Sequence, residues 1–301
     1  MNSKIPVILD TDIGTDIDDT WALAFLLRCP ELDLKLVTTS RGDTVYRARL
    51  AARFLERAGR SNVPVGVGIQ GSEEGNHQEA WIKGYELTDY PGTIHEDGVQ
   101  ALIDTVMNSA EPVTVCAIGP LPNIALALER EPRIAENARF VGMHGCFKRS
   151  HMGSPDVIAE WNVKADPPAC QKVFAAPWDK IITPLDTCGQ IRLTGDKYQR
   201  VAESSDPLAQ DVIDNYRVWK EAGLGKNWTD GSSVLFDTVA VYLCFSKELL
   251  EMKKQPVKVT DEGFTLVEEG APQADCALEW KDMDAFEDFL VTRLISNPDI
   301  S

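Results

Sequence analysis

The sequence predicts an α/β fold, in which a mainly parallel (mixed) central sheet is flanked by helices on both faces. Short apolar runs rich in β-branched residues alternate with segments whose apolar residues recur every 3.6 positions, which is typical of this class. The 301 residues are 44 % hydrophobic and 26 % charged, enough apolar mass for a large core. No linker-like composition, low-complexity tract or internal repeat divides the chain, so we expect a single domain over residues 1–301.

The predicted strands are short, apolar and bounded by turn-forming residues. In chain order we expect strands over residues 6–9, 34–39, 113–118, 140–143 and 181–185, and three more near the C-terminus over 257–259, 264–267 and 277–280.

The predicted helices are amphipathic segments, several of them with recognisable ends. The pattern over 45–58 stops at Gly59, a good helix C-cap, and Asp166 followed by Pro167 begins a helix that runs through Val173. A helix begins near Trp21, and the remaining ones are expected over 99–107, 208–222, 233–243 and 283–295.

The charge balance limits the partners. Thirty Lys and Arg oppose 47 Asp and Glu, which gives a formal net charge of −17. Binding to phosphate backbones or anionic lipid depends on clustered cations, so nucleic acid and membrane surfaces are excluded as expected partners. Neutral or cationic small molecules and metal cations remain.

The sequence also predicts a cytoplasmic protein. The first apolar run ends in a carboxylate at Asp10, unlike a signal peptide, and no apolar run approaches the roughly 18 residues of a membrane span. The seven cysteines are odd in number and form no Cys-x-x-Cys pair, which indicates reduced thiols rather than a disulfide framework.

Aspartates are concentrated directly after the first predicted strand. Five of the ten residues from 10 to 19 are aspartates: Asp10, Asp12, Asp16, Asp18 and Asp19. Helix capping explains one or two of them. Two carboxylates about 4 Å apart repel by roughly 4 kcal/mol at an effective dielectric of 20, so the cluster favours a bound cation. Oxygen ligands suit Ca²⁺ first and Mg²⁺ second.

These residues carry a family resemblance. Segment 7–23 resembles the N-terminal signature of the inosine–uridine-preferring nucleoside hydrolase family, Asp-x-Asp-Pro-Gly-x-Asp-Asp, with two extra residues before the final acidic pair. Segments 63–66, 117–125, 160–162 and 235–240 resemble later blocks of the family in the same order. The resemblance therefore spans nearly the whole chain.

The resemblance implies a Ca²⁺ ion that holds a ribose and the attacking water. By motif position, Asp12 is implied as a metal ligand and the general base, and Asp19 as a bidentate ligand. Ile118, through its carbonyl oxygen, and Asp237 complete the implied ligand set. Asp18 is implied to bind the ribose 2-hydroxyl.

Further residues take implied roles around the sugar. Glu160 resembles the residue that binds the 5-hydroxyl, and Asn162 the one on the 2-hydroxyl side. Asp10 would support the metal ligands, whereas Asp16 lies in the inserted segment and has no role implied by the family.

The chain departs from the family pattern at three positions. Asp43 and Ser154 stand where the family usually has asparagines that bind substrate. Phe236 replaces the histidine that is the family's candidate acid for the leaving base. His95 falls where the family often has a pocket-lining histidine, and Trp228, in a predicted loop, is a candidate for contact with the leaving group.

The resulting hypothesis is a Ca²⁺-dependent hydrolase that cleaves the N-glycosidic bond of a ribonucleoside or nucleoside-like riboside, acting as a homo-oligomer, either a dimer or a tetramer. Two alternatives stay open. One is a non-catalytic or altered-specificity relative that binds Ca²⁺ or sugar. The other is a haloacid dehalogenase-type Mg²⁺ phosphatase, with Asp10 as nucleophile and Asp12 as acid and base.

Overall fold

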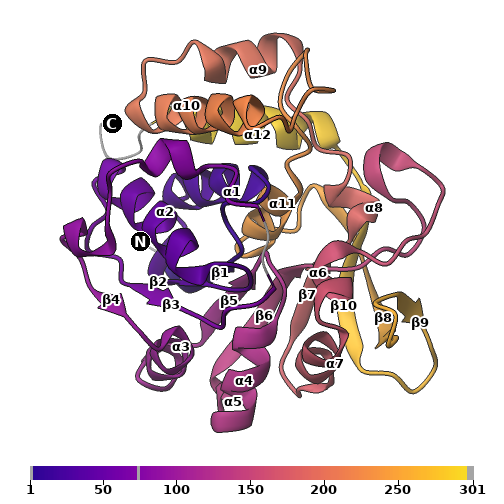
Figure 1. Cartoon of the computed structure of the whole chain (residues 1–301). Coiled ribbons are helices and arrows are strands. Elements are labelled where there is room, and N and C mark those ends of the chain that lie inside the picture. Colours follow the sequence, from indigo (N-terminus) through magenta and orange to yellow (C-terminus); the bar gives the residue numbers. More distant parts are fainter. Residues whose placement is uncertain (1–2, 73–74, 297–301) are drawn as a thin grey trace.

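A computed structural model of the chain describes residues 3–72 and 75–296, whose strands form one ten-stranded sheet in the order β4-β3-β2-β1-β5-β6-β7-β10-β8-β9 (Figure 1). The strands are β1 (Ile5–Thr11), β2 (Leu32–Thr39), β3 (Val65–Val67), β4 (Ile94–His95), β5 (Val113–Ala117), β6 (Ala138–Met143), β7 (Lys180–Thr183), β8 (Leu250–Val259), β9 (Thr265–Val267) and β10 (Gln273–Trp280).

The sheet is mainly parallel. Every neighbouring pair from β4 to β10 is parallel, whereas β8 is antiparallel both to β10 and to β9. The predicted mixed sheet with a parallel centre is therefore confirmed, and the antiparallel part is its C-terminal edge.

Helices cover both faces because successive strand residues point to opposite sides. In β1, Val7 and Leu9 belong to one buried apolar cluster and Ile8 to the other. The first cluster packs against α1 (Asp18–Leu27), α2 (Thr44–Arg57), α10 (Pro207–Glu221), α11 (Phe236–Leu243) and α12 (Met283–Ile295). The second packs against α3 (Gly98–Met107), α4 (Pro122–Arg130), α5 (Ile134–Asn137) and α7 (Pro167–Ala175), on the opposite face in Figure 1.

The remaining helices are short or peripheral. They are α6 (Trp161–Ala165), α8 (Leu185–Cys188), α9 (Gly195–Ala202) and the 3₁₀ turns η1 (Glu79–Ile82), η2 (Leu87–Asp89) and η3 (His151–Gly153). Across residues 3–72 and 75–296, no helix has the length and apolar character needed to cross a membrane.

Most predicted elements are found, with differences at their ends. The predicted strand 181–185 is wrong at its end, because Pro184 has no N–H for the ladder and Leu185 already begins α8. Helix α1 begins at Asp18 rather than near Trp21. The expected strand 257–259 is only the last part of β8, and the short strands β3 and β4 were not predicted.

The topology brings several loops together at one edge of the sheet. Strand β1 lies at the centre, between β2 and β5, and all three are parallel. The chain therefore leaves β1, β5, β6 and β7 at the same carboxyl edge. In open α/β sheets this edge, near the central strand, is where ligands bind.

Candidate active site

A cavity of about 680 Å³ opens at the carboxyl ends of the central strands. The loops after β1, β5 and β6 line it, together with the segment before α11. Its lining has an acidic part and an aromatic and apolar part, which we call the acidic end and the aromatic end. Its lining includes Asp12, Asp16, Asp18, Asp19, Ile118, Glu160, Asn162, Trp228, Phe236 and Asp237, ten of the predicted site residues.

Three buried carboxylates meet at the acidic end. Asp18 and Asp19 lie in the first turn of α1, and Asp237 lies in the first turn of α11. Each offers a carboxylate oxygen, and these oxygens lie within 4.8 Å of one another. Two helix N-termini thus point their partial positive charge at one acidic cluster.

The electrostatics of this cluster fit a hard divalent cation. Burial raises the pKa of Asp18, Asp19 and Asp237 well above the usual range, and the Asp12 carboxylate raises all three further. Carboxylates this close and this buried are stabilised either by protons or by a cation. Oxygen-only donors of this kind suit Ca²⁺ or Mg²⁺, so the residues present could hold such an ion.

The loop that carries Asp12 is held on two sides, by close packing against Gly119 and by hydrogen bonds from Arg47. A Cβ atom at Gly119 would lie 2.6 Å from Asp12 Oδ1 and 2.8 Å from its backbone nitrogen, so only glycine fits there. On the other side, Arg47 from α2 donates hydrogen bonds to the carbonyl oxygens of Asp12 and Ile13. Gly14 then turns the chain with a φ of +119°.

Asn162 fixes the carbonyl group of Ile118. Its Nδ2 donates to the carbonyl oxygens of Ile118 and Met143, each at 3.1 Å, and so ties the end of β5 to the end of β6. The amide nitrogen of Asn162 is thus engaged with backbone. Ile118 and Asn162 both line the cavity.

Glu160 is a buried carboxylate that also shapes the backbone. It caps α6 by accepting hydrogen bonds from the backbone N–H groups of Asn162 at 2.6 Å and Val163 at 3.3 Å. It also accepts a hydrogen bond from the backbone N–H of Gly145 at 3.1 Å. Three such bonds favour the charged form, but burial dominates and raises the pKa of Glu160 to about 7.

Asp10 lies behind the cavity rather than in it. It is 1 % exposed and accepts hydrogen bonds from Thr38 Oγ1 at 3.1 Å and Asn123 Nδ2 at 3.0 Å. Burial raises the pKa of Asp10 to about 7. Since it is sealed from the cavity, it can support the β1 loop but cannot meet a substrate directly.

Aromatic and apolar side chains form the second part of the lining, the aromatic end. Trp219 is buried and stacks on Tyr216, and its indole N–H donates to the Thr15 carbonyl at 3.1 Å. Trp228 lies under the guanidinium of Arg192, 4.4 Å from its ring centroid. These three contacts hold both indoles in place at the cavity wall.

Several residues of this wall were not identified from the sequence. They are His151, Met152, Ile158, Trp161, Leu224 and Ser233. The His151 ring lies 5.4 Å from the Phe236 ring, centroid to centroid. Their loops carry no compact motif, so no spacing in the sequence would have placed them together.

Four predicted residues have other surroundings. Asp16 is exposed at the mouth, where its Oδ1 accepts from Ile17 N. Among the described residues, the cavity lining does not include Asp43, Ser154 or His95. Asp43 caps α2, Ser154 donates to Asp156, and His95 lies in the edge strand β4.

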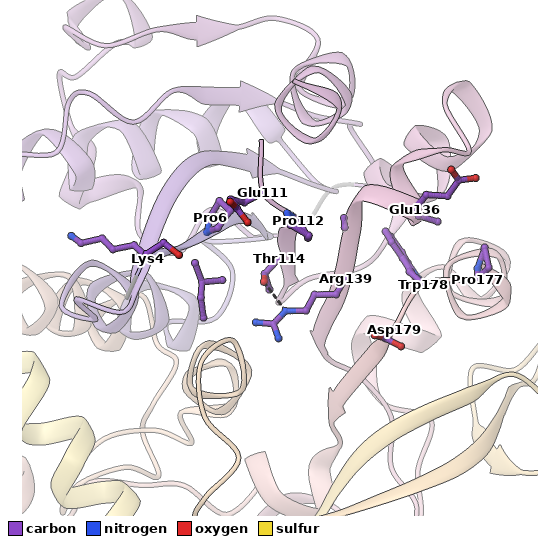
Figure 2. Close-up of a pocket in the computed structure, with 14 residues that line it drawn as sticks. Lys4, Pro6, Glu111, Pro112, Thr114, Glu136, Arg139, Pro177, Trp178 and Asp179 are labelled. Atoms are coloured by element: carbon purple, nitrogen blue, oxygen red, sulfur yellow. Dashed lines mark hydrogen bonds between the residues drawn. The ribbon is translucent and has the colours of Figure 1, made fainter. Parts of the chain in front are cut away.

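A second hollow, of about 560 Å³, lies at the opposite edge of the sheet. Figure 2 shows Lys4, Thr114 and Arg139 at the amino ends of β1, β5 and β6, with Arg139 directed at Thr114. Acidic and basic groups are mixed there, and the buried carboxylate cluster is absent from its described lining. The candidate active site is therefore the cavity at the carboxyl edge.

An open, mainly parallel α/β sheet with an acidic pocket at its carboxyl edge defines the class of molecule. Within that class, the chain belongs to the inosine-uridine preferring nucleoside hydrolase family, whose model matches residues 7–288. The resemblance inferred from the aspartate motif is confirmed.

The chain is also similar to individual members. It is 35 % identical over 203 residues to the non-specific ribonucleoside hydrolase RihC of Klebsiella pneumoniae, an alignment that covers 64 % of this chain and 65 % of that protein. The match therefore spans less than two thirds of that relative's length.

Solved structures share the fold. A plant nucleoside hydrolase superposes with a TM-score of 0.84 at 22 % identity, covering 98 % of this chain and 100 % of the other. The purine-preferring ribonucleoside hydrolase of Gardnerella vaginalis gives 0.81 at 23 % identity, over 98 % and 100 %. The predicted fold class is confirmed by both.

Proposed function

We propose that this chain hydrolyses the N-glycosidic bond of a ribonucleoside or nucleoside-like riboside, with Ca²⁺ bound by Asp12, Asp19, Asp237 and the Ile118 carbonyl. The observation that carries the proposal is the convergence of buried carboxylates from α1 and α11 at one end of a cavity whose other end is aromatic. Family membership and the name of the Klebsiella pneumoniae relative support the same reaction.

The two ends of the cavity suit the two halves of a nucleoside. Breaking the bond to the base leaves positive charge on the ribose, and fixed carboxylates stabilise that charge as it develops. The planar base needs an apolar site with stacking partners, which Trp228 and Phe236 would supply. We therefore propose that the sugar lies over the acidic end and the base against the aromatic wall.

Each residue of the acidic end has a proposed task. Asp12 accepts a proton from the attacking water, and Asp18 binds the ribose 2-hydroxyl. Glu160 binds the 5-hydroxyl while its backbone bonds hold it in place. Asn162 keeps the Ile118 carbonyl aimed at the site. A bound Ca²⁺ would make the water easier to deprotonate and would fix two ribose hydroxyls.

The phosphatase alternative fits the structure poorly. Its nucleophile would be Asp10, which is 1 % exposed and hydrogen-bonded to Thr38 and Asn123. The non-catalytic alternative differs from our proposal only in turnover, so an activity measurement separates the two.

The experiment is ribose release from a panel of nucleosides and p-nitrophenyl riboside, with Ca²⁺ and with chelator. We expect Ca²⁺-dependent release from at least one nucleoside, and a loss of at least about 100-fold in Asp12→Asn, because a positioned base contributes about 10²–10⁴ in rate. Calcium binding without release from any substrate would favour the binding protein. Phosphate release from sugar phosphates would favour the phosphatase.

We also propose a reducing location such as the cytoplasm and a homo-oligomeric state. All seven cysteines are buried and none is in a disulfide, which supports the first. Leu266 and Val267 on the edge strand β9 are 43 % and 56 % exposed, which is compatible with a subunit contact. Sedimentation of the purified protein measures the subunit number.

A further inference from the structure

The chemistry of the leaving base raises a question about the aromatic end of the cavity. When the C1′–N bond breaks, its electron pair stays on the base nitrogen, and most nucleobases leave poorly as anions. A proton donor beside the base removes that barrier. Phe236, at the family's candidate-acid position, has no proton to give, so the donor must come from elsewhere in the cavity.

We propose that His151, in η3 after strand β6, is the general acid that protonates the leaving base. This inference rests on the proposed function. The His151 ring lies against Phe236, 5.4 Å between centroids and inclined by 63°, so it occupies the aromatic end of the cavity from a different part of the chain.

The ring of His151 is available for proton transfer. Within the described parts of the chain, no side chain or backbone group hydrogen-bonds to its nitrogens. Met152, the residue after His151, has a left-handed backbone conformation with a φ of 54°. Its N–H donates a hydrogen bond to the Gly189 carbonyl. This bond fixes the η3 turn that carries His151.

The charged groups around His151 are few. Asp16, from the loop between β1 and α1, acts on it electrostatically and favours the protonated ring, whereas partial burial opposes this and leaves the pKa of His151 below its ordinary value. From α11 it meets the apolar Phe236. Lys164 of α6 also lines the cavity, and histidine is the side chain best suited to donate a proton near neutral pH.

The proton and electron balance closes without a further reactant. The His151 imidazolium transfers its proton to the base nitrogen that receives the electron pair of the C1′–N bond. Water adds to C1′ and gives its proton to Asp12. Ribose and the neutral base leave, His151 regains a proton from solvent, and Asp12 loses one to solvent.

The test compares two leaving groups. In His151→Phe, which keeps a ring against Phe236, we expect kcat for a nucleoside to fall about 100-fold or more, whereas kcat for p-nitrophenyl riboside changes less than about threefold, because nitrophenolate leaves without protonation. His77→Gln is the matched control, since His77 also faces Asp16 but does not line the described cavity. It should leave both rates unchanged.

The pH profile gives a second readout. For the nucleoside, kcat/KM of the wild type should fall as pH rises through the His151 titration, and Asp16→Asn should move this limb to lower pH. Equal losses on both substrates in His151→Phe, or no loss on either, would overturn the assignment. A wild type that releases ribose from neither substrate would instead refute the proposed function.

Discussion

A carboxylate oxygen of Asp18 lies within 4.8 Å of one of Asp237, although the two residues are far apart in the sequence. This proximity exists because α1 and α11 lie side by side, and each helix carries its aspartate in the first turn. Two buried acids this close repel when both are charged, so this proximity makes the free energy of unfolding depend on cations.

Asp18→Asn should have opposite effects in two buffers. With chelator, removal of one repelling carboxylate should raise the free energy of unfolding by about 1–2 kcal/mol. With Ca²⁺ at 100 times its Kd, the wild type should gain about 2.7 kcal/mol and the variant less, because the Asp18 carboxylate lies within 4.8 Å of the proposed ligands Asp19 and Asp237 and its charge attracts the ion. Denaturant unfolding in both buffers measures this. Asp104→Asn, on the exposed side of α3, is the control and should change neither value; the same change for Asp18→Asn in both buffers would contradict the idea.

Gly119→Ala should impair the site while the fold persists. The added Cβ would lie 2.6 Å from Asp12 Oδ1, so Asp12 and the neighbouring Ile118 carbonyl must move. We expect weaker Ca²⁺ binding by calorimetry and a fall in kcat of at least about tenfold, since displaced catalytic groups lose rate steeply.

Gly59→Ala is the matched control for that variant. Gly59 has a φ of +70° but no atom within 4 Å of a built Cβ. Alanine there should lower the free energy of unfolding by about 1 kcal/mol without touching the site. Full activity in Gly119→Ala would contradict the prediction. A loss of activity in Gly59→Ala as well would show that the clash with Asp12 is not the cause of the loss.

The pH dependence of stability should contain a contribution from His144. Its ring is buried between Phe140 and Phe174, and burial lowers the pKa of His144 to about 3. Below the ordinary value of 6.5 the unfolded chain binds a proton that the folded chain does not bind until about pH 3. Folding stability is therefore full above pH 6.5 and falls as the pH drops toward 3.

His144→Leu removes that contribution. Between pH 7.5 and pH 5, the free energy of unfolding should fall by about 2 kcal/mol less in the variant than in the wild type. Urea unfolding at the two pH values, with chelator present, gives the comparison. Parallel pH profiles for wild type and variant would show that His144 is not the group responsible.

The fold was predictable from the sequence wherever an element was long and regular. The helix predicted over 283–295 has those bounds, and Asp166 caps α7 as predicted. Gly59 ends α2 with a positive φ of 70°, one residue after the C-cap residue Ala58. Strands β3 and β4 have three and two residues, too few for any periodicity. The extent of β8 was hidden because its exposed Lys253 and Lys254 interrupt the apolar pattern.

The acidic end of the site was predictable for a different reason. Its aspartates are adjacent in the sequence, and the end of a central strand places them at the sheet's carboxyl edge. The aromatic end is assembled by packing of η3, α6 and the loop before α11, so His151, Trp161 and Ser233 became visible only in three dimensions. Asp43 illustrates the opposite case, since it serves as a helix cap outside the cavity lining.

Calcium-dependent turnover can be measured by a Ca²⁺ titration of chelator-treated protein, with ribose release from inosine and uridine as the signal. We expect no release before the ion is added and a saturable return of activity with a single ion per chain, and no such return in Asp12→Asn. Full activity in the presence of chelator, or saturated Ca²⁺ binding with no ribose released, would contradict it.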